Sequence, residues 1–191
     1  MSNTSKATRF GNPAAVGLAG FAMTTWLSSM INAGWFPNEC SALVFASALA
    51  YGGGAQVIAG LLEFVGGNTF GGTASLSYGC FWLSYSIFFY FFRGEASHAF
   101  IGWYFCLWGI FTLYMWIATL RSPRALQIVF LLLWIALFLL AASEWVASTT
   151  LLVVSGYVGL LTAASAFYYS AAIVINDAHG KPILPIGEVR Q

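Results

Sequence analysis

Long apolar stretches, interrupted by isolated charged residues, set the pattern of this chain. A helix needs roughly 20 mainly apolar residues to cross the hydrocarbon core of a bilayer. Six stretches of about this length or more contain no charged residue: 10–38, 40–62, 64–92, 96–120, 125–143 and 145–176. Within 128–142 the apolar residues are continuous and do not alternate with polar ones, which favours a helix over a strand of a membrane barrel.

The pattern therefore predicts an all-α integral membrane protein, a six-transmembrane-helix bundle. Because the loops between the apolar stretches are short, residues 1–191 should form a single transmembrane domain. The expected spans are about 13–31, 41–65, 73–92, 100–120, 125–146 and 151–175.

Composition excludes several classes of protein. Of 191 residues, 7 are Lys or Arg and 6 are Asp or Glu, so that 7% are charged and 60% are hydrophobic. A soluble domain has roughly a quarter of its residues charged. The chain is therefore neither a water-soluble globular domain nor a disordered one, and it offers no surface for nucleic acid.

The basic residues also predict an orientation. With six spans, the two termini and the loops after the second and fourth spans lie on one side of the membrane. That side would carry six basic residues: Lys6, Arg9, Arg121, Arg124, Lys181 and Arg190. The other side would carry only Arg93. Since Lys and Arg accumulate on the cytoplasmic side, both termini should be cytoplasmic, in a multi-pass protein of the cytoplasmic (inner) membrane.

No arrangement of residues indicates catalysis, a metal or a cofactor. The three cysteines, Cys40, Cys80 and Cys106, have no metal-binding or redox spacing, and the two histidines have no ligand partner nearby in sequence. A nucleophile paired with a base is also absent from the pattern. An enzyme, a metal site and a cofactor are therefore not expected.

Polar residues inside the spans are the candidate functional groups, since a polar group facing lipid is costly. Thr24 and Thr25 lie within the first span, and Gln56 and Glu63 lie two turns apart on one face of the second. Hydroxyls, amides and helix N-termini suit a small anion. Alternatively, the hydroxyls bond to the preceding helical turn. For Glu63, an interfacial salt bridge and a role in substrate or proton handling both stay open.

At this point the residues resemble a known family. Residues 12–18 read Asn-Pro-Ala-Ala-Val-Gly-Leu, which resembles the Asn-Pro-Ala-Pro-Leu-Gly-Leu signature of the acetate uptake transporters, a family that includes the bacterial succinate–acetate permeases. Residues 53–71 and 77–84 match its next blocks, and 184–187 match its tail. Two departures are Ala15-Val16 in the signature and the run 73–76 before Tyr78.

The resemblance implies six helices, cytoplasmic termini, a homo-oligomer (a hexamer in bacteria) and a pathway through each protomer. The implied substrates are acetate and related small carboxylates, commonly succinate. A Phe–Leu–Tyr constriction is a feature of the family. By motif its Phe and Tyr map to Phe21 and Tyr78, and its Leu maps to Leu133, six residues after Gln127. Ala166 matches a position linked to substrate choice.

The first hypothesis is therefore membrane transport of carboxylates. A carboxylic acid with a pKa of about 4.3 is neutral in roughly one molecule in 500 at pH 7, so the anion needs a protein to cross. Donors near the constriction would come from Thr24, Thr25, Gln56, Asn68, Thr69 and Ser77. Proton-coupled symport and an anion channel both stay open, with Glu63 as the candidate proton carrier.

Two other functions stay open. One is export of ammonium or ammonia, which has been proposed for some relatives, although helix-end donors favour an anion. The other is a structural membrane protein that carries no flux and whose polar residues only pack helices. The partners expected for the first hypothesis are acetate, succinate, the lipid bilayer, further copies of the chain and, if transport is coupled, protons.

Overall fold

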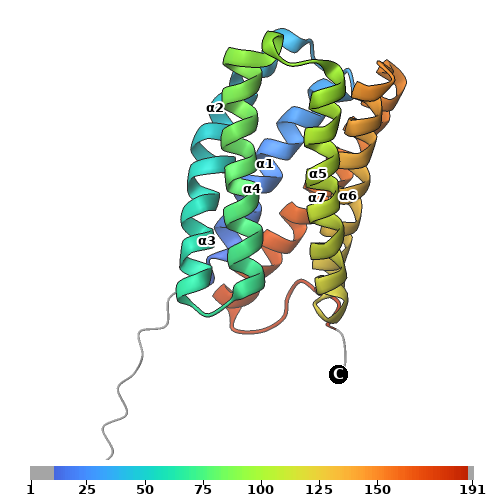
Figure 1. Ribbon diagram of the computed structural model, residues 1–191. Helices are drawn as coiled ribbons and strands as arrows, with labels where there is room; N and C mark the ends of the chain where they lie inside the picture. Colours follow the sequence, from blue (N-terminus) through green and yellow to red (C-terminus); the bar gives the residue numbers. More distant parts are fainter. Residues whose placement is uncertain (1–10, 189–191) are drawn as a thin grey trace, which may run out of the picture.

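The computed structural model describes residues 11–188, and every regular element within them is helical (Figure 1). The helices are α1 (Ala14–Asn32), α2 (Ser41–Ser47), α3 (Gln56–Val65), α4 (Thr69–Ile87), α5 (His98–Ala118), α6 (Arg124–Trp145) and α7 (Thr149–His179). A π-helical segment, Ala48–Ala55, joins α2 to α3, and a second, Phe88–Phe92, continues α4. Single 3₁₀ turns lie at Asn38–Cys40, Arg93–Glu95 and Thr119–Arg121.

Five helical stretches are long and apolar enough to cross a membrane: Ala14–Asn32, Asn38–Val65, His98–Arg121, Arg124–Trp145 and Thr149–His179. With its π-helical continuation, α4 is roughly 36 Å long at about 1.5 Å per residue, so its length also suffices. Its first half is rich in Gly, Ser and Thr and it is not among the apolar five. The number of six spans and the side on which the termini lie stay predictions.

Successive long helices run in opposite directions along the bundle (Figure 1). We call one end the tail end; it holds the connections at 66–68 and 119–123 and the C-terminal segment 180–188. The far end holds the connections at 33–40, 93–97 and 146–148. The helix α1 packs most extensively on α7, and α5 packs on α6.

The outside of the bundle is apolar. Large hydrophobic side chains are exposed on every long helix, among them Leu43, Ile58, Leu107, Ile128 and Leu161. A soluble monomer rarely exposes so much contiguous apolar surface. The exposed surface therefore has the character expected of a protein that faces lipid.

The helix α4 begins four residues earlier than the span expected at 73–92. The Asn68 Oδ1 atom accepts a hydrogen bond from the Gly71 backbone N–H at 3.0 Å, so Asn68 caps the helix. The glycine-rich run 66–72 is therefore a short turn followed by the first turn of a helix.

The π-helical segment Ala48–Ala55 packs closely on α1. A Cβ atom at Gly20 would lie 2.6 Å from the Tyr51 backbone oxygen, and one at Gly52 would lie 2.5 Å from the Thr24 Oγ1 atom. Only glycine permits both approaches, because any side chain would force the helices apart. This contact brings α1 against the middle of the second helical stretch, beside the centre of the bundle.

The C-terminal segment 180–188 crosses the tail end as a strap. Gly180 ends α7 in the left-handed conformation, at φ 61°. The Asn176 side chain then binds the backbone of Ile183 and Leu184. The backbone oxygens of Ile186 and Gly187 accept hydrogen bonds from the first N–H groups of α6. The strap therefore caps a helix start that Pro123 leaves without a side-chain cap.

Candidate functional site

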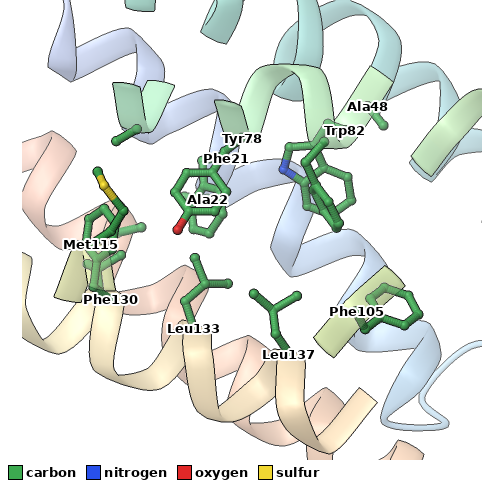
Figure 2. Close-up of a cluster of buried hydrophobic side chains, with 14 of the residues drawn as sticks. Phe21, Ala22, Ala48, Tyr78, Trp82, Phe105, Met115, Phe130, Leu133 and Leu137 are labelled. Atoms are coloured by element: carbon green, nitrogen blue, oxygen red, sulfur yellow. The ribbon is translucent and has the colours of Figure 1, made fainter. Parts of the chain in front are cut away.

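Phe21, Tyr78 and Leu133 meet in the middle of the bundle, on α1, α4 and α6 respectively (Figure 2). All three are buried, with at most 8% of the residue exposed. The Phe21 and Tyr78 ring centroids lie 5.8 Å apart, with the rings tilted at 54°. The structure thus brings together three side chains that are far apart in the sequence.

Two cavities lie on opposite sides of these three residues. The far cavity, toward the far end, has a volume of about 230 Å³, and the tail cavity, toward the tail end, has about 170 Å³. Phe21, Tyr78 and Leu133 are the residues that line both cavities. They therefore form a partition between two chambers that follow one another along the bundle.

The Tyr78 side chain is fixed in the partition from several sides. Its hydroxyl donates to the Thr112 Oγ1 atom at 2.9 Å, and Thr112 in turn donates to the Trp108 backbone oxygen at 2.7 Å. Its ring packs against Phe111 and Phe130, with centroids 5.5 and 6.0 Å away. The Tyr78 hydroxyl already donates its proton to Thr112. The partition therefore presents a mainly apolar surface to a passing solute.

Three of the predicted polar residues line the cavities. Thr25 lines the far cavity, whereas Gln56 and Asn68 line the tail cavity. The Thr25 Oγ1 and Gln56 Oε1 atoms are buried and have no hydrogen-bond partner among the described residues. A buried polar atom without a partner costs about 1–3 kcal/mol. The Thr25 hydroxyl can donate to a bound carboxylate, whereas the Gln56 Oε1 atom is an acceptor and is satisfied only by a donor, such as the O–H group of a carboxylic acid or water.

Five other predicted residues, Glu63 among them, lie outside the lining of both cavities. Thr24 is fully buried against Gly52, with its hydroxyl lacking a partner in the described structure. Thr69 is the first residue of α4, and Ser77 is half-buried. Ala166 is fully buried in the apolar core. Their part in a pathway stays a prediction.

Glu63 lies near the end of α3 and is 4% exposed. Its Oε2 atom accepts a hydrogen bond from the Asn68 Nδ2 atom at 2.6 Å, while its Oε1 atom has no partner among residues 11–188. Asn68 thus caps α4 and binds Glu63 with the two ends of one amide. Glu63 does not line either cavity, whereas its partner Asn68 lines the tail cavity.

Several intramembrane hydroxyls bond to the preceding helical turn, as the alternative reading of the sequence expects. Thr162 donates to the Val158 backbone oxygen at 2.9 Å, and Ser155 and Ser165 bond in the same way at 2.6 and 2.7 Å. These hydroxyls are satisfied within their own helix. Thr25 lacks such a bond, which separates it from the merely structural hydroxyls.

The lining of the far cavity includes residues that the sequence did not single out. Trp108, Asn32 and Asn38 belong to it, together with the charged residues Arg93 and Glu144. Glu144 contacts His98, 46 positions away, at the junction of α5 and α6. The sequence showed no partner near His98, because such a long-range pair leaves no signal in local spacing. In residues 11–188 no group of His, Cys, Asp or Glu side chains is arranged to hold a metal.

Comparison with known proteins identifies the family. The family model described as "GPR1/FUN34/yaaH family" matches residues 2–186. The chain is 42% identical to the "Succinate-acetate/proton symporter SatP" of Escherichia coli (strain K12), over 95% of this chain and 97% of the relative. It is 33% identical to "Acetate permease A" of Emericella nidulans, over 95% of this chain and 67% of the relative.

A solved structure agrees with the sequence comparisons. The fold matches the structure of "the bacterial acetate channel SatP" with a TM-score of 0.90 and 40% sequence identity. The match covers 94% of this chain and all of the solved one. The resemblance that the motifs indicated is therefore confirmed, and the chain belongs to the GPR1/FUN34/yaaH family.

Proposed function

We propose that this protein transports acetate and related small carboxylates, such as succinate, across a membrane through a pathway within each protomer. One observation carries the proposal: two cavities follow one another along the bundle, and the three residues of the partition are common to both. The printed names of the relatives, a succinate-acetate symporter, an acetate permease and an acetate channel, support the same substrates.

In the proposed pathway, Phe21, Tyr78 and Leu133 form the constriction. A carboxylate leaves the donors of one cavity, slides its alkyl part past the apolar side chains and reaches the donors of the other. Thr25 on one side and Gln56 and Asn68 on the other supply neutral hydrogen bonds. Neutral donors bind an anion weakly enough to release it quickly, which suits a conduit.

Orientation and assembly are part of the proposal. Six helices would span the cytoplasmic (inner) membrane with both termini in the cytoplasm. Arg121, Arg124 and Lys181 lie at the tail end, whereas Arg93 lies at the far end, which supports this orientation. Lys6, Arg9 and Arg190 also entered the charge count, but they lie outside the described residues. A hexamer, as the resemblance implies, would place one pathway in each protomer.

Coupling to protons remains a choice between two mechanisms, and the relatives carry both names, symporter and channel. Glu63 is the buried carboxylate nearest to the tail cavity, through Asn68, and would be the proton carrier of a symporter. Ammonium export is less well supported, because the partition is apolar and the carboxylate of Glu63 does not face either cavity. A purely structural role leaves the two cavities unexplained.

The test is flux in reconstituted liposomes. We expect saturable influx of labelled acetate and succinate, measured with and without a pH gradient and with and without a membrane potential. Dependence on the pH gradient at fixed voltage indicates symport, and dependence on voltage alone indicates a channel. Absence of saturable carboxylate flux in protein that is folded and correctly inserted would contradict the proposal.

A further inference from the structure

The far cavity differs from the tail cavity in carrying charge. Arg93 and Glu144 line the far cavity. Every described residue that lines the tail cavity is neutral. A cleft lined by charge concentrates ions of the opposite sign. The two charged residues therefore decide what sign of solute the far cavity attracts.

Arg93 is available to an anion. It follows the π-helical end of α4, and its guanidinium carbon lies 5.4 Å from the centroid of the Phe89 ring, which lines the same cavity. No carboxylate of the described chain lies within ion-pair distance of it. Contact with an aromatic face leaves the N–H groups in the guanidinium plane free to bind a carboxylate.

Glu144 has a different environment. Its side chain is 14% exposed, and its Oε2 atom lies 2.5 Å from the Nδ1 atom of His98, whose side chain is 71% exposed. With the carboxylate ionised, Nδ1 is the donor of this bond. The neighbouring Trp145 Nε1 donates to the Ala99 backbone oxygen at 3.1 Å, which holds the end of α6 against the start of α5 and keeps the pair together.

We propose that the far cavity is a binding site for carboxylate anions, in which Arg93 binds the anion and His98 reduces the repulsion from Glu144. This inference rests on the proposed function, since it identifies where a carboxylate is captured before it reaches the partition. A bound anion is attracted by Arg93 and repelled by Glu144. Donation from His98 draws negative charge of Glu144 away from the cavity, and a doubly charged substrate such as succinate responds more strongly than acetate.

The first test removes the positive charge of Arg93. Equilibrium binding of labelled succinate and acetate to the purified full-length protein is measured beside liposome flux. Arg93→Gln should weaken succinate binding about tenfold and acetate binding less, as expected when a focusing charge is lost from a cleft. Arg93→Lys should keep most of the binding. Arg121→Gln is the matched control, since Arg121 lies at the opposite end of the bundle and lines neither cavity.

The second test separates the role of His98 from simple packing. Glu144→Gln should tighten succinate binding, whereas His98→Ala should weaken it about two- to fivefold, the range of a partly exposed pair. In the Glu144→Gln background, His98→Ala should have no effect, because no repulsive charge is left to moderate. Glu95→Gln, which removes a carboxylate beside Arg93 but outside the lining, is the control.

The outcomes distinguish this inference from the proposed function. Saturable flux with the same succinate affinity in Arg93→Gln and the unaltered protein overturns the inference and leaves the transport function in place. Binding that depends on Arg93 without any flux supports the site and overturns the transport function. Absence of both binding and flux overturns both. An equal effect of His98→Ala in the presence and absence of the Glu144 carboxylate overturns the assigned role of His98.

Discussion

The two cavities face the same partition but differ in the charge of their linings. The far cavity is lined by Arg93 and Glu144 and is the larger, at about 230 Å³. The tail cavity, at about 170 Å³, offers neutral amides from Asn12, Gln56 and Asn68. Charge acts over several ångströms and is screened by salt, whereas neutral donors act only in contact. If carboxylates pass through both cavities, as proposed, the difference assigns capture to the far cavity and short-range selection to the tail cavity.

Two glutamates, the half-buried Glu144 and the buried Glu63, show the same contrast. Glu144 contacts the imidazole of His98, whose side chain is exposed to solvent. The Glu63 carboxylate has the neutral amide of Asn68 as its hydrogen-bond partner among the described residues, and it does not line the tail cavity. A carboxylate therefore lines the far cavity, whereas none of the described carboxylates lines the tail cavity.

The largest expected effect comes from joining the two cavities. Tyr78→Ala removes a third of the partition, so we expect faster flux and a loss of about tenfold in discrimination against longer carboxylates, since pocket shape gives selectivity of this order. Truncation of a buried aromatic residue also costs about 3–5 kcal/mol of stability. Flux of acetate, succinate and a longer carboxylate in liposomes, with thermal unfolding measured in parallel, checks both effects.

Tyr78→Phe is the matched control for this variant. It keeps the ring in the partition and loses only the hydrogen bond to Thr112, which is worth about 1 kcal/mol. Thr112 retains its bond to the Trp108 backbone oxygen, so flux and selectivity should remain close to those of the unaltered protein. Unchanged rate and selectivity in Tyr78→Ala would show that the partition does not control passage.

The next effect concerns the neutral donors of the tail cavity. Gln56→Met keeps the length of the side chain and removes its amide, so the KM for acetate should rise about two- to tenfold, as expected for one lost hydrogen bond. Gln56→Glu places a carboxylate in the neutral cavity and should reduce anion flux further. If both variants transport acetate as well as the unaltered protein does, the tail cavity is not part of the pathway.

Much of this arrangement could be predicted from the sequence, because it rests on local pattern. The long uncharged stretches predicted the helices, and motif positions singled out Phe21, Tyr78 and Leu133, which the structure brings together. The start of α4 was predicted four residues too late, because the glycines that follow Asn68 indicated a break in the helix rather than its first turn. The sequence treated Thr24 and Thr25 alike as donors, because both are polar residues of one span. Both are also buried, and only the lining of the far cavity distinguishes them.

The remaining features depend on how helices pack. The His98–Glu144 pair joins the start of α5 to the end of α6, and the register of two helices decides whether such residues meet. The π-helical segment Ala48–Ala55 and the second bond of Asn68, to Glu63, are likewise set by tertiary contacts.

A smaller effect should follow from salt. Raising the ionic strength from about 0.01 M to about 0.15 M shortens the screening length from about 30 Å to about 8 Å, so succinate binding in the far cavity should weaken a few-fold. Acetate, with one charge, should respond less. The Arg93→Gln variant should lose most of this dependence, whereas Gln56→Met should keep it. The measurement is labelled-succinate binding over a series of salt concentrations.

The smallest effect compares two neighbours on α1. Thr25 lines the far cavity with a hydroxyl that has no partner among the described residues, so Thr25→Val should raise the KM for carboxylates about twofold, the lower end of the range for one lost hydrogen bond. Thr24 is equally unpaired but lies against Gly52, away from both cavities. Thr24→Val should leave the KM unchanged and stabilise the protein by about 1 kcal/mol, because it removes a buried polar atom without a partner. An equal loss of transport in both variants would mean that the hydroxyls act through helix packing; a loss confined to Thr25→Val would tie function to the cavity lining.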